Sequence, residues 1–245
     1  MSIRYPYGLK RLAKVVAPAI RHIGATAPAI RNYVVSALIE NPAFDIPPLE
    51  AKHLDDARLF ANRNDMISSM QFIKSGVIAE VGVAQGDFSE FLIDQLEPKR
   101  FVAFDLFTMH EWTEEGGVPT TKLLNNMKHL EFYKKRFADR STEVLTEVGM
   151  SHLTLAKYPN RSFDLIYIDG DHSYGGVKKD IEIAKNKVSD NGFLIFNDYT
   201  CFSTWDGCIY GVMRAVNELI INDNWVVFGF ALEQRMHYDI ALHKR

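Results

Sequence analysis

The stretch Val77-Ile-Ala-Glu-Val-Gly-Val-Ala-Gln-Gly86 is the part of the sequence that decides the fold. Its first half is a short apolar strand, and the glycines predict a tight turn into a helix over residues 88–96. Gly82 and Gly86 permit this turn and leave room for a ligand beside the backbone. Glu80 places an acid next to the turn, which suits a cationic ligand better than a phosphate.

Strands and helices alternate along the chain on both sides of this turn. Repeated strand–helix units predict a parallel sheet that is buried on both faces and binds ligands at the carboxyl ends of its strands. Residues 225–231 and 238–242 have no helix between them, so we expect them to pair antiparallel. The prediction is an α/β, doubly wound, mostly parallel seven-stranded sheet with an antiparallel last strand. A helix is expected over 57–73 and a long loop over 107–120.

The charge distribution divides the chain into two parts. Residues 1–39 contain six Lys or Arg and no acid, so the net charge of −3 leaves −9 on the remainder. We predict a basic helical N-terminal extension over 1–48 and one domain over 49–245. The acidic domain repels phosphate backbones, so no nucleic-acid partner is expected. The basic extension is suited to an anionic membrane surface or to an acidic neighbouring subunit in a homo-oligomer.

Composition excludes several classes of protein. Hydrophobic residues make up 47% and charged residues 24% of the 245 residues, which is typical of a globular chain. No stretch approaches the roughly 20 apolar residues that a bilayer-spanning helix needs. Cys201 and Cys208 are the two cysteines and cannot form a disulfide framework. A reducing compartment, the cytoplasm, is therefore expected.

A second acid follows the next predicted strand, 101–104. Asp105 stands at its end, where a carboxylate can accept hydrogen bonds from both hydroxyls of a ribose. The dinucleotide fingerprint would require glycine at positions 84 and 87, but Ala84 and Asp87 occupy them. A pyrophosphate site is therefore disfavoured, and an NAD(P)-binding oxidoreductase remains only as the alternative function.

The fourth and fifth predicted strands also run directly into polar residues. Asp169, Asp171 and His172 follow one strand, and Asn197 and Asp198 follow the other. A core does not require several acids at one sheet edge, so this pattern indicates function. Asp169, Asn197 and Asp198 would offer a hard, all-oxygen ligand set that favours Mg²⁺, with Mn²⁺ or Ca²⁺ as alternatives. His172 could accept a proton from a hydroxyl group.

The glycine turn and Asp105 together resemble two motifs of the class I S-adenosylmethionine-dependent methyltransferases. The resemblance covers residues 55–245 and implies S-adenosylmethionine as the cofactor. It implies a methionine pocket shaped by Glu80, Gly82 and Gly86, and ribose binding by Asp105. It further implies an adenine site bordered by Gly149, Met150 and Ser151.

The run Ile168-Asp-Gly-Asp-His-Ser-Tyr174, followed by Asn197-Asp-Tyr199, resembles the group that contains macrocin-type and other sugar O-methyltransferases. This resemblance implies a divalent ion on Asp169, Asn197 and Asp198, and either His172 or Asp171 as the general base. We therefore expect methylation of a hydroxyl on a sugar or glycosylated small molecule. A non-catalytic protein that kept the fold is a third hypothesis, which the intact acid cluster opposes.

Overall fold

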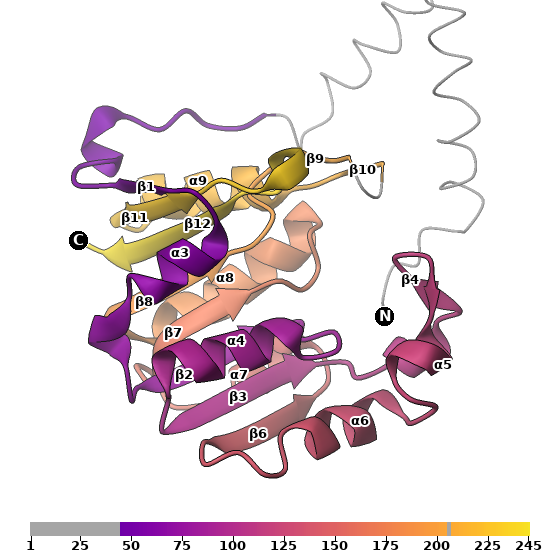
Figure 1. Cartoon of the computed structure of the whole chain (residues 1–245). Helices are drawn as coiled ribbons and strands as arrows, with labels where there is room; N and C mark the ends of the chain where they lie inside the picture. The colour runs from indigo at the N-terminus through magenta and orange to yellow at the C-terminus, as the bar shows by residue number, and fades with distance from the viewer. Residues whose placement is uncertain (1–44, 205–206) are drawn as a thin grey trace, which may run out of the picture.

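The computed structural model describes residues 45–204 and 207–245, and in this part the chain forms three layers. A twisted sheet lies in the middle, with helices on both of its faces (Figure 1). The predicted N-terminal extension, 1–48, falls almost wholly outside the described residues. The eight strands of the sheet are β1 (Arg58–Phe60), β2 (Val77–Val81), β3 (Arg100–Asp105), β6 (Glu143–Val148), β7 (Phe163–Ile168), β8 (Val188–Phe196), β11 (Trp225–Ala231) and β12 (Asp239–Lys244).

The strand order is β1-β11-β12-β8-β7-β2-β3-β6. β12 runs antiparallel to both β11 and β8, as predicted, and the other pairs in the sheet are parallel. From β2 the chain continues to β3 on one side, while β7 pairs with β2 on the other side. The carboxyl ends of β2 and β7 therefore meet where the strand order reverses, the usual place for a ligand in such sheets.

The helices are divided between the two faces of the sheet. They are α3 (Arg63–Ser68), α4 (Asp87–Leu96), α5 (Thr120–Leu123), α6 (His129–Arg136), α7 (Ser151–Leu155), α8 (Tyr174–Lys187) and α9 (Val212–Asn222). α3, α4 and α6 cover one face, and α7, α8 and α9 cover the other (Figure 1). Successive residues of a strand point to opposite faces, so Tyr167 packs with the first group and Ile166 with the second.

The segment expected to be one helix over 57–73 is instead a strand and a shorter helix. Arg58–Phe60 forms β1, which pairs with β11 at the sheet edge, and Leu232 N–H donates to Phe60 O at 3.0 Å. α3 begins only after Asn62, whose side chain accepts the Asp65 N–H at 2.8 Å. The expected helix was wrong because pairing with a distant strand prevailed over local helical spacing.

Two other segments carry more structure than the sequence indicated. The expected loop 107–120 contains a 3-10 turn, η4 (Met109–Glu111), and a small hairpin of β4 (Glu114–Glu115) and β5 (Val118–Pro119). Between β8 and α9 lies a second hairpin, formed by β9 (Phe202–Ser203) and β10 (Cys208–Ile209). The remaining short turns are η2 (Ala51–His53), η3 (Gln71–Ile73) and η5 (Gln234–Met236).

None of the helices in the described part of the chain is both long enough and apolar enough to span a bilayer.

Candidate active site

The turn after β2 depends on glycine for its contact with β7. Gly82 has a φ of +82°, and a Cβ atom at this position would overlap the carbonyl oxygen of Asp169. Gly86 has a φ of +86°, and its Cβ would lie 2.9 Å from rings of both Tyr133 and Phe137. The glycines therefore bring protein segments close together. That is a different reason from the ligand access inferred from the sequence.

Glu80 is buried beneath this turn, on the face covered by α4. Its carboxylate accepts a short hydrogen bond from Ser89 Oγ, which in turn accepts one from the Tyr133 hydroxyl at 2.8 Å. Burial raises the pKa of Glu80 to about 8, although the bond from Ser89 acts in the opposite direction. The side chain is therefore largely uncharged at neutral pH, and a positive charge close by would favour its ionised form.

Asp105 connects the loop that follows β3 to the turn at 80–86, named the cofactor turn after the ligand predicted for it. Its Oδ2 accepts the Val83 N–H at 3.0 Å and its Oδ1 accepts the Phe107 N–H at 2.5 Å. The side chain remains 17% exposed. Each carboxylate oxygen has a second lone pair, so both can also accept a hydroxyl group from solution.

His129 is a site residue that the sequence analysis missed. Its Nδ1 accepts the Met109 N–H at 3.3 Å, so the proton must be on Nε2, which donates to Ala84 O at 2.5 Å. Its ring packs on Phe107 with centroids 5.0 Å apart. His129 thus joins the cofactor turn, the loop after β3 and the start of α6. Nothing in its local sequence distinguishes it from an ordinary helix residue.

The residues expected beside adenine lie at the end of β6. Gly149 N–H donates to Asp105 O at 2.9 Å, which places this turn next to the acid predicted to bind ribose. Ser151 Oγ donates to Asp180 at 2.5 Å. Burial raises the pKa of Asp180 to about 6. Gly149, Met150 and Ser151 therefore border the same sheet edge as Asp105.

At the neighbouring edge, the structure brings His172 between two aspartates. His172 Nε2 lies 3.3 Å from Asp169 Oδ1 and 3.5 Å from Asp198 Oδ2. The imidazole stacks on Tyr210, with ring centroids 4.6 Å apart and planes 9° from parallel. Burial by itself would lower the pKa of His172, but the nearby carboxylates of Asp169 and Asp198 raise it above its ordinary value.

Two of the predicted residues at this edge point elsewhere. Asp171 Oδ1 accepts the Ser173 N–H at 2.9 Å, at the start of α8. Asn197 donates its side-chain N–H to Asp239 Oδ1 at 3.0 Å. Of the two candidate bases, His172 is therefore the one that contacts the acid pair.

His237 completes the group and was also missed by the sequence analysis. It lies between β11 and β12, and its Nδ1 is 2.9 Å from Asp198 Oδ1. The Nε2 atoms of His172 and His237 are both buried without a hydrogen-bond partner among the described residues. The part of the chain that the structure describes contains no group of three His, Cys, Asp or Glu side chains arranged to hold a metal ion.

A polar network links Asn197 to the face of the sheet that α3, α4 and α6 cover. Asp239 is fully buried and accepts the Tyr167 hydroxyl at 2.6 Å as well as the Asn197 amide. Arg63 donates to the Tyr167 oxygen at 3.3 Å. Burial raises the pKa of Asp239 to about 7, with Tyr167 and Arg63 opposing the shift.

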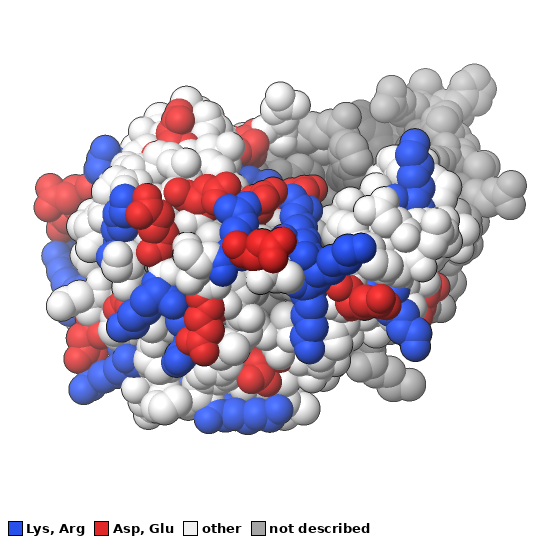
Figure 2. Space-filling view, turned by 60° about the horizontal axis from the view of Figure 1, so that its bottom comes forward, with Lys and Arg blue, Asp and Glu red and all other residues white. Residues whose placement is uncertain are grey.

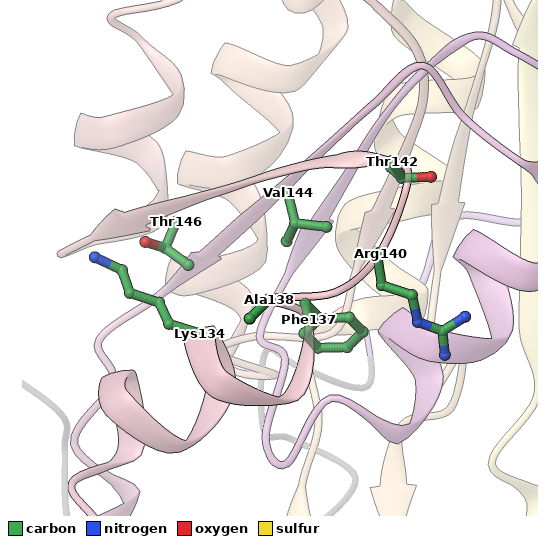
Figure 3. A pocket seen from close by; sticks show the side chains of 7 residues that line it. All are labelled: Lys134, Phe137, Ala138, Arg140, Thr142, Val144 and Thr146. Atoms are coloured by element: carbon green, nitrogen blue, oxygen red, sulfur yellow. The ribbon is translucent and has the colours of Figure 1, made fainter.

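The outer surface beside α6 has a different character. Here α4 and α6 are joined by exposed or half-exposed ion pairs, among them Arg136 to Asp87 and Arg136 to Glu90, each at 2.7 Å. Acidic and basic side chains are interleaved on the face that Figure 2 shows, rather than gathered into a stripe of one sign. A hollow of about 190 Å³ lies between α6 and β6. Figure 3 shows its lining side chains, which include none of the site residues above.

Comparison with known proteins places this geometry in context. A family model described as a methyltransferase domain matches residues 79–199, which contain the cofactor turn and both edges of the site. An uncharacterized protein of Acanthamoeba polyphaga mimivirus is 23% identical over 141 residues, and the match covers 58% of each chain. The chain thus spans less than two thirds of that relative.

Two solved structures have a similar fold. One is a Staphylococcus aureus protein provisionally assigned as a caffeoyl-CoA O-methyltransferase, with a TM-score of 0.52 and 13% identity over 94% of this chain and 98% of that one. The other is the Podospora anserina methyltransferase PaMTH1 bound to S-adenosylhomocysteine, with a TM-score of 0.50 and 16% identity over 75% and 78%. At this identity the likeness concerns the fold alone.

Proposed function

Because the chain belongs to the class I S-adenosylmethionine-dependent methyltransferases, we propose that it methylates a hydroxyl of a sugar or glycosylated small molecule. The family membership sets aside the alternative of an NAD(P)-binding oxidoreductase. One observation supports a hydroxyl acceptor above the others. His172 Nε2 lies within 3.5 Å of carboxylate oxygens of both Asp169 and Asp198, and the Asp169 backbone lies against the turn at Gly82. This arrangement supports His172 as a proton acceptor beside the cofactor turn.

The residues divide the work of methyl transfer between them. S-adenosylmethionine, when bound, supplies an electrophilic methyl group for in-line displacement by an oxygen nucleophile. Asp105 would accept the ribose hydroxyls and hold the cofactor in position. His172 would take the proton from the acceptor hydroxyl, and Asp169 and Asp198 would stabilise the imidazolium that results. Asp171, the alternative base, would instead hold the start of α8 in place through its bond from Ser173 N–H.

The proposal includes a divalent ion, with Mg²⁺ as the first candidate. One carboxylate oxygen of Asp169 and one of Asp198 lie within 3.5 Å of His172 Nε2. Two hard donors therefore converge on the space beside this nitrogen. Asn197 would be the third ligand through its amide oxygen, since its nitrogen is used by Asp239. An ion there would lower the pKa of the acceptor hydroxyl. The two tasks of Asp169 and Asp198 are alternatives, because an ion on their oxygens would oppose an imidazolium beside it. His172 is therefore the route for the proton when no ion is bound.

The test is transfer of labelled methyl from S-adenosylmethionine to a panel of glycosides and sugars, with their methyl ethers at the reactive position as controls. Labelled product from the glycosides alone is expected. Transfer only to amines or thiols would overturn the proposal. EDTA followed by Mg²⁺ addition tests the ion, and Mn²⁺ titration of wild-type protein and Asp169→Asn gives a readout independent of turnover. Unchanged turnover of Asp169→Ala and Asp198→Ala in EDTA would contradict the ion.

The basic N-terminal residues carry a separate proposal about partners. The basic residues of 1–39 would contact an anionic membrane surface, or an acidic subunit in a homo-oligomer. Vesicle flotation and light scattering, with and without residues 1–39, test the two. Equal behaviour of both forms in both assays would contradict any such contact. Nucleic acid remains outside the proposal because the domain carries net negative charge.

A further inference from the structure

Arg63 is the charged group in this region that neither the predicted site nor the proposed chemistry uses. It is the first residue of α3, and its position is set at the backbone by its N–H, which donates to Glu233 Oε1 at 3.1 Å. Its guanidinium carbon lies 4.3 Å from the centroid of Phe88, the second residue of α4. The guanidinium therefore lies over the start of the helix that follows the cofactor turn.

The guanidinium is poorly satisfied for a half-buried cation. Within the part of the chain that the structure describes, its one hydrogen bond goes to the neutral hydroxyl of Tyr167 at 3.3 Å, although an arginine side chain carries five N–H donors. Among the described residues, no carboxylate comes within ion-pair distance of it. Buried or half-buried arginines are usually paired with an anion, because an unpaired charge is costly to remove from water.

Two aspartates act on Arg63 through space without touching it. Burial would lower the pKa of Arg63, but Tyr167, which it contacts, and the charge of Asp239, with a smaller effect of Asp169, raise it. Asp239 uses its oxygens for Tyr167 and Asn197. Glu80 pairs with Tyr167 in the β2–β7 register and is occupied by Ser89. The donors of Arg63 therefore remain open beside the turn that receives the cofactor.

We propose that Arg63 binds the α-carboxylate of S-adenosylmethionine. The adenosine half is provided for at Asp105 and Gly149, at the ends of β3 and β6. The amino-acid half must then extend over the turn, toward β7, Phe88 and Arg63. A guanidinium matches a carboxylate by two parallel N–H···O bonds, which its stacking on Phe88 leaves free. This assignment rests on the cofactor of the family and not on the identity of the acceptor.

The test compares two ligands that differ only in the carboxylate. S-adenosylhomocysteine carries it, and S-adenosyl-3-thiopropylamine lacks it while keeping the amine, thioether, ribose and adenine. Calorimetric titration of the full chain gives both dissociation constants. Arg63→Gln is expected to raise the Kd of S-adenosylhomocysteine about 10- to 100-fold, as for loss of a hydrogen-bonded charge pair. Arg63→Gln should change the Kd of S-adenosyl-3-thiopropylamine less than twofold. For S-adenosylhomocysteine, the Kd of Arg63→Lys should lie between those of wild type and Arg63→Gln.

Arg58→Gln is the matched control, because Arg58 also stacks on an aromatic ring, 4.8 Å from the Phe60 centroid, but on β1. It should change neither constant more than twofold. Equal weakening of both ligands by Arg63→Gln would show a structural role and overturn the assignment, and so would an unchanged Kd for S-adenosylhomocysteine. If wild-type protein binds neither ligand, both the role of Arg63 and the assignment of S-adenosylmethionine as the cofactor are overturned. Failure of every hydroxyl acceptor with intact S-adenosylhomocysteine binding would affect only the proposed function.

Discussion

The ends of β2 and β3 and the ends of β7 and β8 lie side by side in one sheet, yet their polar groups are satisfied to different degrees. In the first region, Glu80, Asp105 and His129 all have hydrogen-bond partners within the fold. In the second, His237 Nε2 has no hydrogen-bond partner among the described residues, and His172 Nε2 has only the ion-pair contacts of 3.3 and 3.5 Å to Asp169 and Asp198. A buried polar atom without a partner costs free energy, so natural proteins keep few of them. Glu80, Asp105 and His129 are thus satisfied before any ligand binds, whereas the open ring nitrogens of the second region agree with the proposal that a ligand binds there.

The largest expected effect comes from breaking the second region alone. His172→Ala should lower kcat about 10²- to 10⁴-fold, because it removes the proposed base. The Kd of S-adenosylhomocysteine should change less than threefold, since the first region is untouched. Steady-state kinetics and calorimetry measure the two. His243→Ala, on β12 with its Nδ1 near Lys244 O, is the control histidine and should leave kcat unchanged. Equal loss of kcat in both variants would remove the catalytic role.

The second test breaks the first region through its backbone. Gly82→Ala should destabilise the protein by about 4 kcal/mol, since a positive φ and overlap with the Asp169 carbonyl both oppose the new Cβ. Gly117 has nearly the same φ, +83°, with no atom within 4 Å of its Cβ position. Gly117→Ala should therefore cost only about 1–2 kcal/mol. Urea denaturation measures both. Equal losses would mean that the approach of β7 to the turn is unimportant.

The third test concerns the buried acid of the first region. The folded pKa of Glu80, about 8, exceeds its ordinary value of 4.5, so the folded protein holds this proton to higher pH than the unfolded chain does. Its contribution to stability is full below about pH 4.5 and is lost as the pH rises through 8. For protein without cofactor, Glu80 alone should lower the free energy of unfolding by on the order of 2–4 kcal/mol from pH 5 to pH 8.

Glu80→Gln should remove the part of the fall that Glu80 causes, as urea denaturation at several pH values would detect. Asp239 and Asp180, with raised pKa values of about 7 and 6, would leave a slope of the same sign and of similar total size. A variant with the full wild-type slope would show that Glu80 is ionised in the folded protein.

The smallest expected effect comes from loosening the first region without removing a cofactor contact. His129→Ala deletes the bonds to Ala84 O and from Met109 N–H. At about 0.5–1.5 kcal/mol for a net hydrogen bond, the Kd of S-adenosylhomocysteine should rise about 3- to 10-fold. Calorimetry measures the change, with His243→Ala again as control. An unaltered Kd would mean that the turn keeps its shape without the histidine.

How far the sequence could predict the molecule follows the same division. The turn at 80–86 and the acid Asp105 could be recognised because backbone geometry and nearby spacing define them. The parallel sheet and its antiparallel last pair followed from alternation of strands and helices, which depends on burial pattern alone. Asp169, His172 and Asp198 could be expected to meet because the carboxyl ends of adjacent strands share an edge.

Other site residues could not be predicted, because contacts between segments far apart in the sequence determine their positions. His237 reaches Asp198 from the connection between β11 and β12, and Arg63 reaches Tyr167 from a segment expected to be helical throughout. Side-chain direction was equally inaccessible. Asp171 and Asn197 have the right type and position, but bonds to Ser173 and Asp239 decide where they point.

The edge strand β1 has a consequence for how the protein is made. Its partner β11 is synthesised near the end of the described chain, and the bond from Arg63 to Glu233 joins residues 170 positions apart. On the ribosome, β1 and α3 emerge before β11 and β12 are synthesised. Phe60 therefore stays exposed to solvent until the β11–β12 hairpin has left the exit tunnel. A nascent chain that stalls before residue 225 can form the glycine turn but cannot position Arg63 beside it.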